Sequence, residues 1–156
     1  MLKVFAAYDS KYGNTRIAAE KILEGINEVG EFETAIGDVK EIDIEKLAEY
    51  DALILGAPNH MGRPSQTMKK FVNRLSALSL KTKDVAVFGT YSGTARTPDR
   101  AVKKLEQMVK KRLPALNLLS PSLSVRVKGI PGPIWEGELP RCVEFGKNIA
   151  SQIKGH

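Results

Sequence analysis

Cysteine and long hydrophobic runs are nearly absent from this chain of 156 residues. Cys142 is the only cysteine, which excludes an internal disulfide and a metal site built from several cysteines. No apolar run approaches the roughly 18 to 20 residues that a membrane-spanning helix needs. The chain also begins in a strand pattern, without the basic and apolar regions of a secretory signal. We therefore expect a cytoplasmic protein that does not associate with a membrane.

Aromatic residues and histidines are also scarce. Aromatic side chains make up 6% of the residues and do not alternate with the basic ones, and no nucleic-acid-binding motif is present, so we expect no nucleic-acid partner. Neither His60 nor His156 has a carboxylate nearby in the sequence. Since there is no Ser–His–Asp arrangement and no metal-ligand spacing, we assign neither catalytic residues nor a metal site.

The remaining composition is that of a globular protein with an excess of positive charge. Hydrophobic residues make up 42% and charged residues 27%, and the length favours a single domain spanning 1–156. Lys and Arg number 24 against 18 Asp and Glu, which gives a net charge of +6. Most basic residues fall on polar positions of predicted helices, as on solvated faces. The alternative is a positive field that attracts an acidic partner or a phosphorylated cofactor.

Strand-like and helix-like segments alternate five times along the chain. The three strongest strands, at 2–8, 52–57 and 84–89, are apolar throughout, as expected for central parallel strands covered on both faces. The weaker segment 32–39 is typical of an edge strand. The last strand is predicted at 116–119 or 123–127, and the helices at 16–29, 44–49, 65–77, 98–112 and 139–153.

This alternation predicts an α/β fold with three layers. A doubly wound, five-stranded parallel sheet in the order 2-1-3-4-5 places the weak strand 32–39 at an edge and the three strong strands side by side. The loops after these strong strands, at 9–15, 58–63 and 90–96, then meet at the carboxyl ends of the strands, where open α/β sheets bind ligands. They are also the loops richest in Gly, Ser, Thr and Asn.

The first of these loops, 9–15, is the most informative. It carries the hydroxyls of Ser10 and Thr15 and the flexible Gly13 between a buried strand and a helix, so its backbone N–H groups can bind an anion. The other interpretation is an ordinary turn in which Asn14 or Thr15 caps the helix. Together the three loops suit a phosphorylated planar cofactor and offer little acid–base chemistry, which favours a protein whose reactive group belongs to the cofactor.

The three loops also resemble the flavin-binding loops of the flavodoxin family. Residues 8–15 resemble the loop that binds the phosphate of FMN, 56–63 the second flavin loop and 88–93 the third. The resemblance covers nearly the whole chain and implies a flavodoxin-like fold with FMN as the cofactor. By position, it implies that FMN is bound by Ser10, Lys11, Tyr12, Gly13, Asn14, Thr15, Pro58, Asn59, His60, Met61, Gly62, Thr90, Tyr91, Ser92 and Gly93.

The resemblance assigns the parts of FMN to different loops. It implies that the first loop holds the phosphate and that residues 58–62 line the isoalloxazine ring. Tyr91 would stack on the ring, with Ser92 and Gly93 offering amides to its pyrimidine edge. A backbone peptide near Gly62 would turn toward the flavin.

Two features depart from the family pattern. His60 and Met61 stand where flavodoxins often carry an aromatic side chain, and the net charge is positive whereas electron-carrying flavodoxins are typically acidic. Trp135, far from the loops in sequence, is expected to pack in the core or on the surface. The positive charge favours either an acidic redox partner or the phosphates of NAD(P)H, because four arginines lie in or beside the loops: Arg16, Arg63, Arg96 and Arg100.

Three functions follow from these observations. The leading hypothesis is an electron-carrier flavodoxin that works with redox partner proteins, as a monomer or a weak homo-oligomer. The second is an NAD(P)H-dependent quinone or flavin reductase on the same fold, which residues 56–62 also resemble, although the chain lacks an obvious insertion for a second substrate pocket. The third is a flavin-free interaction module.

Overall fold

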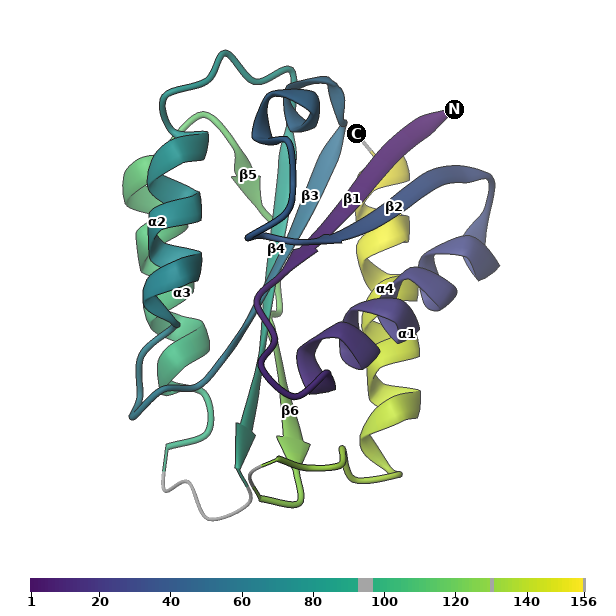
Figure 1. The fold of residues 1–156 in the computed structure, drawn as a ribbon. Helices are drawn as coiled ribbons and strands as arrows, with labels where there is room; N and C mark the ends of the chain where they lie inside the picture. Colours follow the sequence, from purple (N-terminus) through teal and green to yellow (C-terminus); the bar gives the residue numbers. More distant parts are fainter. Residues whose placement is uncertain (93–96, 130, 156) are drawn as a thin grey trace.

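The computed structural model describes residues 1–92, 97–129 and 131–155, which form three layers (Figure 1). A parallel sheet lies in the middle, with α1 and α4 on one face and α2 and α3 on the other. None of the helices that the structure describes has the length and apolar character to cross a bilayer. The helices are α1 (Asn14–Val29), η1 (Ile44–Glu49, a 3₁₀ helix), α2 (Gln66–Leu75), α3 (Arg100–Arg112) and α4 (Glu138–Lys154).

The strand order is β2-β1-β3-β4, followed by two short strands, β5 and β6, that both pair with β4. β5 pairs with the first residues of β4 and β6 with its last. The predicted order 2-1-3-4-5 is therefore confirmed, and both candidate segments for the last strand share the fifth position. The strands are β1 (Leu2–Tyr8), β2 (Phe32–Asp38), β3 (Ala52–Pro58), β4 (Asp84–Ser92), β5 (Asn117–Leu118) and β6 (Leu123–Val127).

The register aligns the carboxyl ends of four strands. The loops after β1, β3, β4 and β6 therefore leave the sheet side by side at one end, and the two termini lie at the other end (Figure 1). The residues paired at the carboxyl ends are Tyr8 with Gly56, Pro58 with Thr90 and Ser92 with Val127.

Each face of the sheet has its own apolar core. The core under α1 and α4 includes Ile22, Phe88 and Ile149, and the core under α2 and α3 includes Phe71 and Leu105. All five side chains are at most 2% exposed. The uniformly apolar central strands are thus covered on both faces, as their sequence predicts.

Helices α1 and α4 approach each other so closely that glycine is needed on both. A Cβ atom added to Gly25 would lie 2.0 Å from the backbone oxygen of Val143, and one added to Gly146 would lie 2.0 Å from the backbone oxygen of Ile22. No side chain fits at that distance, so the two helices pack backbone against backbone at these points.

Two helix starts differ from the prediction by two residues. α1 begins at Asn14 rather than at residue 16, and the residue before it, Gly13, has a φ of 91° and makes no side-chain cap. The alternative interpretation of this loop, an ordinary turn with Asn14 or Thr15 as the helix cap, is therefore wrong in its choice of cap. α3 begins at Arg100, so Pro98 precedes the helix instead of opening it.

The third loop is shorter than predicted because β4 is longer. β4 continues through Ser92 instead of ending at residue 89, since β6 pairs with it from Phe88 to Ser92. Thr90 and Tyr91 consequently belong to a strand rather than to a loop. At the opposite edge, β2 pairs regularly with β1 through Asp38.

Candidate cofactor site

A cleft lies at the carboxyl ends of the strands, between the three predicted loops and the segment after β6. Its cavity volume is about 120 Å³. Because pockets for whole cofactors usually exceed roughly 300 Å³, the cleft encloses only part of a ligand of that size. The residues that line it are Ser10, Lys11, Tyr12, Asn14, Thr15, Pro58, Asn59, His60, Thr90, Tyr91, Ser92, Val127, Gly129 and Pro131.

Most of the residues predicted to bind a cofactor are thus brought together in one place. Gly13, Met61 and Gly62 belong to the same loops but do not line the cleft. Gly93 lies outside the described residues, as does Arg96.

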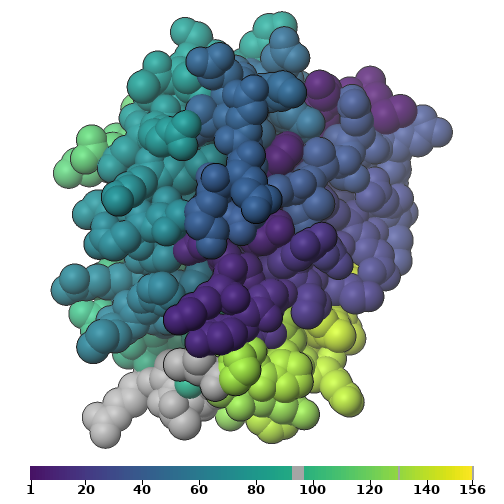
Figure 2. Space-filling view, in the orientation of Figure 1, coloured from purple at the N-terminus to yellow at the C-terminus, as the bar shows by residue number. Residues whose placement is uncertain are grey.

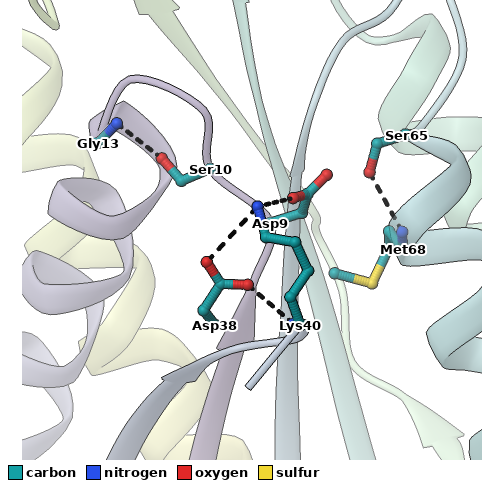
Figure 3. Close-up of polar contacts among 7 residues, drawn as sticks. All are labelled: Asp9, Ser10, Gly13, Asp38, Lys40, Ser65 and Met68. Carbon is teal, nitrogen blue, oxygen red and sulfur yellow. Dashed lines mark hydrogen bonds and ion pairs between the residues drawn. The ribbon is translucent and has the colours of Figure 1, made fainter. Parts of the chain in front are cut away.

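The first loop has the geometry of an anion cradle. Gly13 takes a left-handed conformation, and its N–H donates to the hydroxyl oxygen of Ser10 at 2.9 Å (Figure 3). The first helical bond of α1 runs from the N–H of Ile17 to the oxygen of Gly13, at 3.0 Å. The N–H groups of Asn14 and Thr15 therefore precede the helical ladder at the positive end of the helix dipole.

Two buried hydroxyl groups join the first loop to β4. The hydroxyl oxygens of Thr15 and Thr90 lie 3.2 Å apart, within hydrogen-bond distance, and both residues line the cleft. The hydroxyl of Ser10 accepts the N–H of Gly13 and so keeps its own proton for donation to a ligand. These groups give the floor of the cleft several hydrogen-bond donors.

Lys40 forms ion pairs with two carboxylates beside the start of the first loop. The side-chain ammonium of Lys40 lies 3.7 Å from the carboxylate of Asp9 and 3.8 Å from that of Asp38. The backbone N–H of Lys40 also donates to the carboxylate of Asp38, at 2.8 Å (Figure 3). The side chain of Asp9 is largely buried. Since a carboxylate at this place repels an anion, the ion pairs with Lys40 lessen that repulsion, and the single ammonium offsets one of the two negative charges.

The second loop is a tight turn held by its own backbone. His60 and Arg63 exchange two hydrogen bonds, of 2.7 and 3.0 Å, and the N–H of Gly62 donates to the side-chain oxygen of Asn59 at 2.6 Å. The turn places Met61 at φ 54° and Gly62 at φ 82°. A positive φ is unusual for methionine, and the Met61 side chain is 96% exposed at the tip of the turn.

The segment after β6 forms a fourth wall that the sequence analysis did not predict. Val127, Gly129 and Pro131 line the cleft, and the side-chain amide of Asn14 donates to the oxygen of Pro131 at 2.6 Å. In the space-filling view this yellow-green segment lies against the dark-purple first loop (Figure 2). The predicted topology could have indicated this wall, because the segment follows a strand that ends at the same edge of the sheet as the three loops.

Arg16 and Trp135, two further residues considered in the sequence analysis, make their contacts outside the cleft. Arg16 forms an exposed ion pair of 2.9 Å with Glu20, and this hydrogen bond raises the pKa of Arg16. Trp135 is 42% exposed and packs on the surface, with the cationic groups of Arg126 and Lys128 5.2 and 4.9 Å from its ring. These contacts lie outside the lining of the cleft.

The sheet order and the cleft at its switch point define a ligand-binding protein of the doubly wound α/β class. The family model of the flavodoxin domain matches residues 5–129 of the chain. Over 158 residues, the chain is 31% identical to a flavodoxin of Clostridium saccharobutylicum, with 98% of each chain covered. The chain therefore belongs to the flavodoxin family.

Two further comparisons extend this result. The structure of oxidised Flavodoxin 2 from Bacillus cereus matches with a TM-score of 0.77 and 26% identity, over 96% of this chain and 99% of that one. An NAD(P)H dehydrogenase (quinone) of Caulobacter vibrioides is 33% identical over 97 residues. That match covers 50% of this chain and 49% of the dehydrogenase, so only half of each protein is similar.

Membership of the flavodoxin family implies FMN as the cofactor, and the lining of the cleft fits such a ligand. The described lining contains Lys11 and several hydroxyl and amide groups but no carboxylate, which suits a phosphate. The space around Gly13 is open, since a Cβ atom there would meet nothing within 4 Å. Tyr91, Pro58 and Val127 add the aromatic and apolar surface that a flavin ring requires.

Proposed function

We propose that this protein binds FMN in the cleft and carries electrons between redox partner proteins. The observation that carries this proposal is the convergence of the three flavin-like loops on one carboxylate-free cleft at the switch point of the sheet. Bound FMN supplies the electron-transfer chemistry of its isoalloxazine ring. The chain supplies binding, orientation and a local electrostatic environment. A cytoplasmic location and a monomeric or weakly self-associating state remain predictions.

In this proposal the first loop binds the phosphate. The N–H groups of Asn14 and Thr15 at the start of α1 and the hydroxyls of Ser10 and Thr15 donate to its oxygens. Gly13 allows the backbone to approach the ligand, and Lys11 and Tyr12 lie at the exposed rim. Thr90 supports Thr15 from β4 through their shared hydrogen bond.

The second and third loops enclose the ring. Residues 58–62 form one side, with Pro58, Asn59 and His60 in the lining, and Tyr91 and Ser92 form the other. We assign the peptide between Met61 and Gly62 as the ring contact of the second loop. Its two residues both have positive φ, a backbone conformation that costs energy for methionine and therefore favours a functional role. Gly93 is proposed as a further amide donor.

A reductase is the second candidate, because the chain shares 33% identity over 97 residues with an NAD(P)H dehydrogenase (quinone). The two functions differ in their electron source. A carrier receives electrons from a protein, whereas a reductase takes hydride directly from a nicotinamide and passes the electrons to a quinone. The match to a flavodoxin over 98% of the chain supports the carrier.

An anaerobic titration tests the proposal. The purified protein is saturated with FMN and reduced stepwise with dithionite while its visible spectrum is recorded. We expect micromolar or tighter FMN binding, reduction in two resolved one-electron steps, and no bleaching by NADPH. Rapid bleaching by NADPH with quinone-dependent turnover would identify the reductase. Absence of FMN binding at micromolar concentration would exclude both functions and leave the interaction module.

A further inference from the structure

A basic surface lies beside the second loop, on the face of the sheet that α2 and α3 cover. α2 carries no acidic residue, and α3 carries Glu106 as its only one against six Lys and Arg. Two neighbouring surface depressions share Lys104 as a lining residue. We call this surface the α2–α3 basic face and define it by the cations that line the two depressions: Arg63, Lys69, Arg100, Lys103 and Lys104.

The cations of this face have no carboxylate partners in the described part of the chain. The recorded ion pairs of the described residues involve α1, α4 and Lys40, and none involves the α2–α3 basic face. Asp99 lines one of the depressions but forms no such pair. Partial burial lowers the pKa of Lys104, and the charges of Arg100 and Arg63 lower it further, as expected where like charges repel one another at close range. An external anionic surface would relieve this repulsion.

The basic face borders the loop that we assign to the flavin ring. Arg63 ends the tight turn of that loop. The side chain of Arg100 covers Gly62, because a Cβ atom added to Gly62 would lie 2.9 Å from Cδ of Arg100. A protein bound to this face would therefore lie directly beside the second loop of the cleft.

We propose that the α2–α3 basic face is the docking surface for an acidic redox partner protein. This inference rests on the proposed electron-transfer function and names the chemistry of the partner. The charges spread over a loop and two neighbouring helices, which suits a complementary protein surface (Figure 1). A dinucleotide fits less well, because the described lining of the two depressions contains no aromatic ring on which a base could stack.

The test maps contacts on the flavin-free and the FMN-loaded protein by amide NMR. The probe is a ferric c-type cytochrome of net negative charge, with the basic cytochrome c as the comparison. At about 0.01 M ionic strength we expect line broadening at Gly62, Arg63, Arg100 and Lys104 with the acidic cytochrome only. At about 1 M, where the Debye length falls to about 3 Å, the broadening should disappear.

Two triple variants that each remove three positive charges distinguish an effect of the α2–α3 basic face from an effect of the net charge of the protein. At low ionic strength, R63Q/R100Q/K104Q should lower the affinity for the acidic cytochrome about tenfold. The second-order rate constant of electron transfer to this cytochrome should fall by the same factor. K110Q/K111Q/R112Q removes three exposed charges from the opposite end of α3 and should change both by less than about twofold.

Several outcomes would overturn the docking proposal. Equal losses in the two variants would mean that only net charge matters. Broadening centred on α1 and α4, or equal binding of both cytochromes, would place the contact elsewhere. The face is a nucleotide site if NADPH shifts the resonances of the same amides and R63Q/R100Q/K104Q weakens the binding of NADPH but not of the acidic cytochrome. Failure of the protein to bind FMN would overturn the proposed function instead. The two failures are distinguishable, because the contacts with the cytochrome are also measured on the flavin-free protein.

Discussion

The side-chain amide of Asn14 donates a hydrogen bond of 2.6 Å to the backbone oxygen of Pro131, which joins the first turn of α1 to the segment after β6. The two residues are 117 positions apart in the chain. Gly132 leaves room for this contact, because a Cβ atom there would lie 2.4 Å from the Asn14 amide nitrogen. One side chain thus positions two walls of the cleft relative to each other.

Removing this amide should loosen the fourth wall. In Asn14→Ala, the segment 128–135 loses its bond to the first loop, so its amides should exchange hydrogen faster even without flavin. FMN affinity, measured by quenching of flavin fluorescence, should fall about two- to tenfold for the loss of one hydrogen bond. Asn148→Ala, an exposed change on α4, is the control. Unchanged exchange in the flavin-free Asn14→Ala protein would show that Asn14 does not hold this segment.

The phosphate assignment rests on two hydroxyl groups and can be tested directly. The double substitution Ser10→Ala with Thr15→Ala removes two donors to a charged ligand and should weaken FMN binding by about 2–4 kcal/mol. Riboflavin, which lacks the phosphate, should bind both proteins with similar affinity. Ser151→Ala on the exposed side of α4 controls for the loss of a hydroxyl. An FMN affinity equal to that of the parent protein would rule out these roles.

Because α1 and α4 are in close contact, we expect a glycine-to-alanine substitution there to lower stability, although the same change usually stabilises a helix. In Gly146→Ala, the new Cβ meets a backbone oxygen at 2.0 Å and must push the helices apart. Overpacking of this kind costs about 1–3 kcal/mol, and the contact with rigid backbone favours the upper part of that range over the gain of about 1 kcal/mol in helix propensity. Urea denaturation measures the loss.

Gly137 offers the matched control for this substitution. It has a φ of −64° and nothing within 4 Å of an added Cβ, so Gly137→Ala should leave stability unchanged or raise it slightly. Equal stabilities for Gly146→Ala and Gly137→Ala would contradict the packing described for α1 and α4.

Cys142 should make stability fall at alkaline pH. Burial, and to a lesser extent the charge of Glu138, raises the pKa of its thiol from 9.0 to about 12. The unfolded chain therefore releases this proton at lower pH than the folded one, so the stabilising effect is complete below pH 9.0 and is lost as the pH rises toward about 12. The slope is about 1.4 kcal/mol per pH unit.

A comparison with Cys142→Ala isolates this contribution from the titration of lysines and tyrosines. The parent protein should lose unfolding free energy more steeply than the variant above pH 9.0, as measured by denaturant titrations at several pH values. The thiol should also resist thiol reagents in the native protein and react once the protein is unfolded. Parallel pH curves for the two proteins would contradict the proposed burial effect.

The alternation of strong apolar strands with amphipathic helices was sufficient to predict the strand order, because only a few right-handed topologies place a weak strand at the edge. The same reasoning brought the first three loops to one end of the sheet. Local sequence also placed the start of α2 to within one residue: the helix begins at Gln66, and Ser65 caps it, with its hydroxyl accepting the N–H of Met68 (Figure 3). Features that depend on neighbours in sequence were therefore predictable.

Features that depend on distant partners were not. The extension of β4 to Ser92 requires β6, and the fourth wall requires the contact of Asn14 with Pro131, so neither leaves a local pattern. The start of α1 was misplaced because Gly13 turns the chain without a side-chain cap, whereas the usual signal of a helix start is such a cap.

The division of the last sheet position between β5 and β6 limits how this molecule can associate. An open sheet edge offers unpaired backbone groups on which a strand from another copy can grow. Here β5 has two residues and β6 has five, with Pro121 between them, which has no N–H to donate. Such an interrupted border is a poor template for an added strand, and it thereby protects the protein from aggregating through that side.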